Sequence, residues 1–205
     1  MSVLSSPIQV PALDFSPELL LRAQGIKVAF FDVDGVLTDG GLYFSEYPDG
    51  HECAQTLGGF RASGEIIKRF NTLDGHGLKL LQKVGITPVV ITGRDSSVLR
   101  ARLKALGVTH SHFGTEDKRP AAELTLNALG VDWNAAAAMG DDWPDLPVMS
   151  RSALSCAPAN AHPEVRARAH HVTQPNGGHG AAREFCDLLL IASGRYAGLL
   201  REYTQ

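Results

Sequence analysis

The sequence predicts an α/β fold in which helices cover both faces of a mostly parallel sheet, and three observations support this prediction. Short apolar runs alternate with helix-like segments from Asp74 onward, which is typical of parallel strands joined by helices. Polar residues directly follow several of these runs, at the carboxyl ends of the expected strands, where open α/β sheets bind ligands. The length of 205 residues and the 44% hydrophobic content suit one domain with a full core. We therefore expect a doubly wound, Rossmann-like sheet with a β-hairpin excursion.

The chain divides into three predicted segments. Ser16 and Pro17 indicate a short helix near the start, because serine caps helices and proline suits the first turn. Two extended stretches, 40–44 and 65–70, are expected to pair as a hairpin with a long, glycine-rich tip. The expected division is an N-terminal arm with a short helix (1–25), a main domain that includes the hairpin insertion at about 40–71 (26–192) and a C-terminal tail (193–205).

The elements expected after the hairpin alternate between helix and strand. Leucine and valine at helical spacing predict the helices, and short apolar runs predict the strands. In order, they are a helix at 78–84, a strand at 88–91, a helix at 98–106, a short strand near Phe113, a helix at 124–129, a strand at 135–139, edge strands at 152–157 and 170–173, and a helix at 180–190.

Composition and charge favour small-molecule partners over nucleic acids or membranes. A net charge of -3 and a pI near 6.2 provide no general basic field for a nucleic-acid backbone. Three scattered cysteines without a CxxC pair indicate neither a disulfide framework nor a zinc site. The sequence shows no basic leader before an apolar stretch and no apolar segment of membrane length, so we expect a cytoplasmic protein.

Two carboxylates follow the first apolar run of the main domain. The run ends in Asp32, and Asp34 stands two positions later, directly before Gly35. Because side chains of a strand alternate with a period of two, both carboxylates start on one side of the sheet. Their repulsion and desolvation require a metal or another cation, and the glycine lets the turn offer its amides to an anion. The motif indicates a phosphoryl-transfer site, with an ordinary acidic turn as the alternative.

Further candidate residues follow a second apolar run and begin a later helix. Thr92, Gly93 and Arg94 provide a hydroxyl and a cation, which suit a phosphate oxygen and a substrate anion. The alternative is that Thr92 caps the next helix. Lys118 can reach a phosphate as a point charge, and its alternative is a surface lysine at a helix start.

A second acidic cluster follows the strand expected at 135–139. It contains Asp141, Asp142 and Asp145. Carboxylate oxygens of this kind suit Mg²⁺, which binds one or two carboxylates and keeps waters and substrate oxygens as its other ligands. The alternative is an acidic helix cap, and it applies above all to Asp142 and Asp145.

The order of these motifs, from aspartate pair through threonine and lysine to acidic loop, resembles that of the haloacid dehalogenase-like phosphatases. The resemblance covers residues 27–191 and rests first on the DxD motif at 32–34. It implies that Asp32 is the nucleophile that becomes an aspartyl phosphate. It implies that Asp34 protonates the leaving alcohol and then activates water, and that Thr92 and Lys118 bind the phosphate.

The same resemblance implies a magnesium site. Its ligands would be the Asp32 carboxylate, the Asp34 backbone carbonyl and Asp141, with Asp142 and Asp145 in the outer shell. These roles are chemically consistent, because a carboxylate that attacks a phosphate dianion needs its charge screened by Mg²⁺ and a lysine.

The short spacings between the motifs leave no room for a large cap domain. In this the chain is similar to the 3-deoxy-D-manno-octulosonate 8-phosphate phosphatases, which act in lipopolysaccharide biosynthesis. That resemblance implies a homotetramer in which neighbouring subunits complete one another's pockets. The matching segments are 34–40, 70–77, 92–94 and 177–184.

Arg94 carries the expectation about the substrate. A guanidinium at this position suits a bidentate contact with a sugar-acid carboxylate, whereas the related nonulosonate 9-phosphate branch has an acidic residue there. Arg102 is a weaker candidate, and contributions of Arg102, His76 and Arg183 to a neighbouring pocket are left open. The hairpin tip at 50–64 is longer than is usual in the family, and its role is also left open.

Three alternatives remain beside the octulosonate phosphatase. The chain could hydrolyse another sugar-acid phosphate, such as a nonulosonate 9-phosphate, because the phosphate chemistry is generic. A receiver-like signalling switch also uses acidic residues, threonine and lysine on a doubly wound sheet, but it does not need a second carboxylate two positions after the acceptor. A catalytically inactive scaffold would not need the intact set of acids and lysine.

Overall fold

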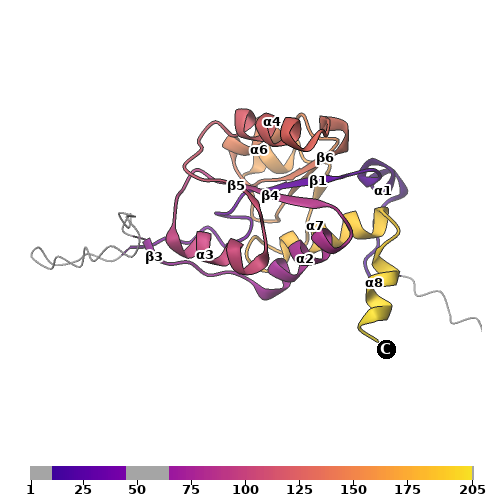
Figure 1. Cartoon of the computed structure of the whole chain (residues 1–205). Helices are drawn as coiled ribbons and strands as arrows, with labels where there is room; N and C mark the ends of the chain where they lie inside the picture. Colours follow the sequence, from indigo (N-terminus) through magenta and orange to yellow (C-terminus); the bar gives the residue numbers. More distant parts are fainter. Residues whose placement is uncertain (1–10, 45–64, 205) are drawn as a thin grey trace, which may run out of the picture.

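Residues 11–44 and 65–204 are described by a computed structural model of the chain (Figure 1). They form eight α-helices, eight strands and two short 3₁₀ helices. The helices are α1 (Pro17–Ala23), α2 (Thr72–Lys83), α3 (Ser97–Leu106), α4 (Lys118–Leu129), α5 (Leu146–Met149), α6 (Pro163–Arg166), α7 (Ala181–Ala192), α8 (Tyr196–Glu202), η1 (Trp133–Ala135) and η2 (Trp143–Asp145). The strands are β1 (Val28–Phe31), β2 (Tyr43–Phe44), β3 (Glu65–Ile67), β4 (Thr87–Ile91), β5 (His110–His112), β6 (Ala136–Met139), β7 (Leu154–Ala157) and β8 (His171–Val172).

The central sheet confirms the predicted doubly wound architecture. Its six strands are parallel and follow the order β5-β4-β1-β6-β7-β8. From β1, the chain adds β4 and β5 on one side of the sheet and then β6, β7 and β8 on the other. Folds of this type bind ligands at the point where the strand order changes side. β8 lies at one edge, as predicted. The prediction of an edge strand at 152–157 was wrong, because β7 pairs with β6 on one side and β8 on the other.

Helices cover both faces of the sheet (Figure 1). α4 and α6 lie on one face, and α2, α3 and α7 lie on the other. Adjacent residues of β1 serve both faces, because side chains alternate along a strand. Phe31 packs against Phe185 of α7 with ring centroids 5.5 Å apart, whereas Phe30 belongs to the second apolar cluster together with Leu126 of α4. The sheet is therefore buried on both sides, as its apolar strands require.

The predicted hairpin excursion is present as β2 and β3, which pair antiparallel in a separate two-stranded sheet. Figure 1 shows β3 projecting away from the central sheet. Among the described residues, no large cap domain is inserted between the strands of the main sheet. The predicted tip at 50–64 lies outside the described residues.

Local capping sets the boundaries that apolar spacing alone misplaced. α2 begins at Thr72, ahead of the expected start at residue 78, because the Asn71 side chain accepts a hydrogen bond from the backbone N–H of Leu73 at 2.8 Å.

The segment expected as a C-terminal tail contains α8, whose Leu199 is buried. No helix within 11–44 or 65–204 has both the length and the apolar character of a membrane span.

Candidate active site

Three neighbouring strands deliver the polar residues of one site. β4, β1 and β6 lie side by side and parallel, so their carboxyl ends open onto the same edge of the sheet. Asp32 follows β1, Thr92 follows β4, and Asp141 lies just beyond β6. The backbone N–H of Asp32 donates to the carbonyl of Met139 at 3.1 Å and so fixes the end of β1. The topology thus gathers residues that are far apart in the sequence.

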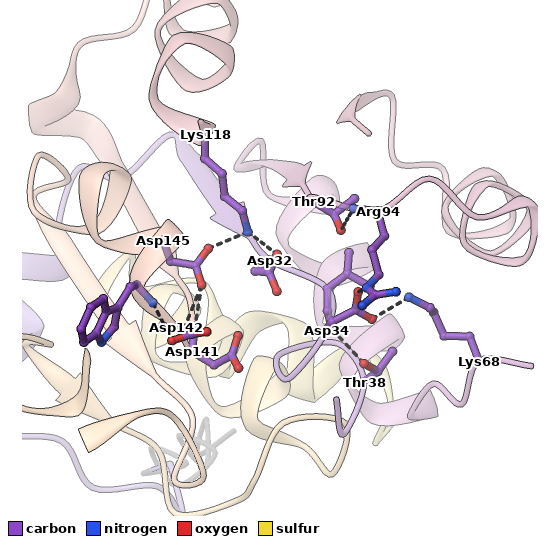
Figure 2. A network of polar contacts seen from close by, with 12 residues as sticks. Asp32, Asp34, Thr38, Lys68, Thr92, Arg94, Lys118, Asp141, Asp142 and Asp145 are labelled. Carbon is purple, nitrogen blue, oxygen red and sulfur yellow. Dashed lines mark hydrogen bonds and ion pairs between the residues drawn. The ribbon is translucent and has the colours of Figure 1, made fainter. Parts of the chain in front are cut away.

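Lys118 is the first residue of α4, and its ammonium group reaches into this edge (Figure 2). Its Nζ donates to Asp32 Oδ1 and, at 2.7 Å, to Asp145 Oδ1. The residue is only 6% exposed, so the alternative of a surface lysine is wrong. Asp117 caps α4 through its own side chain, which leaves the Lys118 side chain to point inward.

Asp145 organises the acidic loop after β6. Its Oδ2 accepts the backbone N–H groups of Asp141 at 2.9 Å and Asp142 at 3.2 Å. Asp142 in turn accepts the backbone N–H of Trp143 at 2.8 Å, which completes a capping box on η2. The capping alternative thus describes contacts that Asp142 and Asp145 make, and both oxygens of Asp145 are engaged.

The site concentrates negative charge. Burial, together with the charge of Asp145, raises the pKa of Asp32 to about 7 against the opposing effect of Lys118. Burial, together with the charges of Asp32 and Asp145, raises the pKa of Asp141 to about 8. Burial alone would lower the pKa of Lys118, but the carboxylates of Asp32 and Asp145 outweigh it and raise that pKa. Three close carboxylates around one ammonium group favour the entry of a further cation.

The residues present fit a divalent cation. Carboxylate oxygens of Asp32, Asp141 and Asp145 lie within 4.8 Å of one another, and such hard oxygens suit Mg²⁺. Because Asp145 is engaged by Lys118 and two backbone N–H groups, Asp32 and Asp141 are the pair best placed to bind the ion. Gly35 makes room for this arrangement, since a Cβ there would lie 2.1 Å from Asp141 Oδ2.

Asp34 faces away from the acidic loop and toward two cations (Figure 2). Lys68 Nζ donates to Asp34 Oδ1 at 2.6 Å, and Arg94 Nε lies 3.5 Å from Oδ2. The Asp34 side chain is 22% exposed, compared with 8% for Asp32. This partly open carboxylate is placed to exchange protons with a substrate or water. The expected metal contact through its backbone carbonyl stays a prediction.

Lys68 is the site residue that sequence reasoning missed. It follows β3, and its side chain is 1% exposed. The pattern at 65–70 indicated only an extended arm, because the hairpin insertion separates Lys68 from Asp34 in the sequence. One signal was available: a lysine lies at the base of the hairpin arm that returns toward the loop after β1, residues 33–39, which is called the catalytic loop below. Its acidic partner could be identified only from the fold.

Thr92, Gly93 and Arg94 lie together beyond β4. The Thr92 backbone N–H donates to the carbonyl of His112 at 3.0 Å, and its buried Oγ1 accepts the backbone N–H of Arg94 at 3.3 Å. The capping alternative for Thr92 is wrong, because Ser96 caps α3. Gly93 is exposed and has open space where a Cβ would be. Their assignment as phosphate and substrate ligands stays a prediction.

The three residues left open make contacts within this chain. Arg102 donates to the carbonyl of Asn71 at 3.4 Å, and Arg183 pairs with Asp187 on the same helix at 2.9 Å. His76 packs edge-on against Tyr203, with ring centroids 5.7 Å apart. A role in a neighbouring subunit's pocket stays a prediction for all three residues. 

Known proteins share both the sequence and the fold. A family model described as haloacid dehalogenase-like hydrolase matches residues 114–185. A 3-deoxy-D-manno-octulosonate 8-phosphate phosphatase from Yersinia pestis is 38% identical over 181 residues, which cover 88% of each chain.

Two solved structures extend this similarity. A probable YrbI-family phosphatase from Pseudomonas syringae is 43% identical, with a TM-score of 0.83 over 93% of this chain and 99% of that one. The octulosonate phosphatase from Moraxella catarrhalis, solved with magnesium, phosphate and KDO, is 31% identical, with a TM-score of 0.79 over 91% of this chain and 98% of that one. The chain therefore belongs to the 3-deoxy-D-manno-octulosonate 8-phosphate phosphatase family of haloacid dehalogenase-like hydrolases.

Proposed function

We propose that this chain is a Mg²⁺-dependent phosphatase that releases phosphate from 3-deoxy-D-manno-octulosonate 8-phosphate, a step of lipopolysaccharide biosynthesis. The observation that carries the proposal is the buried Asp32 carboxylate, which Lys118 orients beside Asp141, with a partly exposed second acid two residues later. The names of the relatives and the ligands of the Moraxella catarrhalis structure support the substrate and the metal.

In the first step, a carboxylate oxygen of Asp32 attacks phosphorus and the ester P–O bond breaks. Asp34, the partly exposed acid, donates a proton to the departing sugar oxygen. Lys118 holds the nucleophile in one orientation, which reduces the entropy cost of reaching the attack geometry. The products of this step are the free sugar acid and an aspartyl phosphate on Asp32.

In the second step, Asp34 accepts a proton from a water molecule, and the resulting hydroxide attacks the aspartyl phosphate. The P–O bond to Asp32 breaks, inorganic phosphate leaves and the carboxylate is restored. Asp32 and Asp141 would hold Mg²⁺, which supplies positive charge to the phosphoryl oxygens. Thr92 and Lys118 are the proposed protein ligands of the same group.

Arg94 is proposed to select the sugar acid. Its side chain is 45% exposed, and its Nε lies 3.5 Å from Asp34 Oδ2, so the guanidinium can exchange that distant partner for a substrate carboxylate. A phosphate ester without a carboxylate would not use this contact. Among residues 11–44 and 65–204, no feature favours a nonulosonate phosphate instead. Family membership favours a phosphatase over the receiver-like switch.

The test is phosphate release from a panel that includes 3-deoxy-D-manno-octulosonate 8-phosphate and a nonulosonate 9-phosphate, with Mg²⁺ and with a chelator. We expect metal-dependent release with a clear preference for the octulosonate. Asp32→Asn should reduce release to background while the circular dichroism spectrum stays that of the parent. Preference for another ester would overturn the substrate, and an active Asp32→Asn variant would overturn the mechanism.

We further propose that the protein is a cytoplasmic homotetramer assembled around the β2–β3 hairpin. Leu42, Tyr43 and Ile67 in and beside these strands are between 39% and 56% exposed. Exposed apolar groups of this kind are typical of protein interfaces. Light scattering after gel filtration should give four times the chain mass, and Tyr43→Lys together with Ile67→Lys should reduce it. A monomeric parent protein would contradict this assembly.

A further inference from the structure

A glycine turn before α7 packs backbone to backbone against the catalytic loop. The N–H of Gly178 donates to the carbonyl of Val36 at 2.9 Å. A Cβ on Gly177 would lie 1.7 Å from the carbonyl oxygen of Gly35, and a Cβ on Gly178 would lie 2.5 Å from the carbonyl carbon of Thr38. No side chain larger than hydrogen fits at either position without displacing the loop.

The loop that receives this turn carries the acid of the proposed reaction. It curls on itself, because Thr38 donates through its backbone N–H and its Oγ1 to the carbonyl of Val33, at 2.9 and 3.1 Å. Gly35 therefore has two close neighbours: the Asp141 carboxylate occupies the space of its missing Cβ, and Gly177 abuts its carbonyl. Because Gly35 follows Asp34 and contacts the Asp141 carboxylate, a displacement of the loop at Gly177 would move Asp34 and change the contact with Asp141.

The turn is itself anchored to two other parts of the fold. The N–H of Gly177 donates to the side-chain oxygen of Asn160 at 2.7 Å. Asp74 of α2 is buried and accepts the N–H groups of Gly180 at 3.3 Å and Arg183 at 2.8 Å. Asp74 thereby satisfies N–H groups at the start of α7 that have no partner within the helix. The turn is held firmly enough to act as a support for what it touches.

We propose that Gly177 and Gly178 are positioning residues, which hold the catalytic loop so that Asp34 and the Gly35 backbone keep their places beside Asp32 and Asp141. The inference rests on the proposed function for its kinetic consequence, whereas its structural consequence can be measured without any substrate. Enzymes lose about 100-fold in rate when reacting groups are misplaced by about 1 Å, so a small displacement of this loop has a measurable effect.

The test compares Gly178→Ala with Gly194→Ala. Both glycines have a left-handed backbone, with φ of +67° and +69°, but a Cβ on Gly194 meets nothing within 4 Å. The two variants therefore share the backbone strain and differ in contact with the catalytic loop. Hydrogen exchange of the peptide that covers 33–39 is measured in the metal-free proteins, and kcat and KM are measured with Mg²⁺.

We expect faster exchange at 33–39 and a kcat reduced roughly 10- to 100-fold in Gly178→Ala, with KM changed much less. Gly194→Ala should match the parent in both measurements. Equal behaviour of the two variants would overturn the proposal, and so would a lower kcat without faster exchange.

If Gly178→Ala does not fold, Asn160→Ala removes one anchor of the turn and should speed exchange at 33–39; unchanged exchange there would overturn the proposal. If the parent protein proves inactive on octulosonate 8-phosphate but Gly178→Ala still exchanges faster at 33–39, the proposed substrate is rejected and the structural role of the glycine turn stands.

Discussion

The two carboxylates of the DxD motif stand in contrasting surroundings, although one residue separates them. Asp32 is enclosed by Lys118, Asp141 and Asp145, and its side chain is 8% exposed. Asp34 meets Lys68 and Arg94 on the open side, where it is 22% exposed. In the proposed mechanism, the enclosed half serves the chemistry common to all phosphate esters, whereas the open half combines the acid with Arg94, the proposed contact to the variable part of a substrate. The comparison predicts that changes on the enclosed side impair every substrate most strongly. On the open side, a change at Lys68 should weaken the acid for every substrate, whereas a change at Arg94 should discriminate between substrates.

The largest effect is expected from Lys118→Met on the enclosed side. The change leaves the buried carboxylates of Asp32 and Asp145 without their shared cation, and losing one partner of a buried pair costs about 3 kcal/mol or more. We expect activity near background on every ester. We also expect lower stability at pH 8 than at pH 6, because removing Lys118, which lowers the pKa of Asp32, leaves that pKa raised by burial and by Asp145; the folded variant then holds a proton that the unfolded chain has released, and a higher pH disfavours folding. Urea unfolding at both pH values measures this, with Lys79→Met on the exposed face of α2 as the control. Activity of Lys118→Met equal to that of the parent would contradict the prediction that the enclosed side is needed for every ester.

Lys68→Met on the open side should have a smaller effect. Asp34 would lose its 2.6 Å contact and with it a fixed orientation, but it would remain available to donate a proton. We expect kcat to fall roughly tenfold, below the 10²- to 10⁴-fold that general acid–base catalysis contributes. Lys68→Arg should recover part of the loss. Steady-state kinetics that leave kcat unchanged in Lys68→Met would show that Asp34 is oriented by other contacts.

Arg94→Ala should separate substrates. We expect KM for octulosonate 8-phosphate to rise roughly tenfold, since a charge-assisted hydrogen bond contributes about 1.5 kcal/mol. Hydrolysis of p-nitrophenyl phosphate, which has no carboxylate, should be unchanged. Arg119→Ala, an exposed residue of α4, is the control. An equal loss on both esters would place Arg94 with the phosphate-binding groups.

The smallest effect concerns pH and metal. The raised pKa values of Asp32 and Asp141 mean that the metal-free folded protein holds protons that the unfolded chain releases above its ordinary carboxyl pKa of 3.8. This contribution to stability is complete below that value and is lost as pH rises through about 7 to 8. Mg²⁺ competes with the same protons, so its stabilising effect on thermal unfolding should be larger at pH 8.5 than at pH 6. Equal shifts at both pH values would exclude these carboxylates as its ligands.

The sequence predicted the parts of this molecule that short segments encode. The buried strand before Asp32 and the capping pattern of the acidic loop are both local. β7 was misplaced at the edge because strand order depends on pairing with β8, a strand of two residues. The partnership of Lys68 and Asp34 spans the whole hairpin insertion, and the docking of Gly177 on the catalytic loop depends on how α7 packs. Such long-range contacts leave no periodic signal in the sequence.

The Lys68–Asp34 ion pair closes the base of the β2–β3 excursion, because its two partners stand on either side of that insertion. A segment pinned at its base can change length cheaply, since each doubling of a flexible loop costs only about 0.6 kcal/mol in closure entropy. Insertions and deletions between β2 and β3 should therefore leave the position of Asp34 unchanged. The Lys68–Asp34 ion pair thus allows the number of residues between β2 and β3 to vary without moving Asp34.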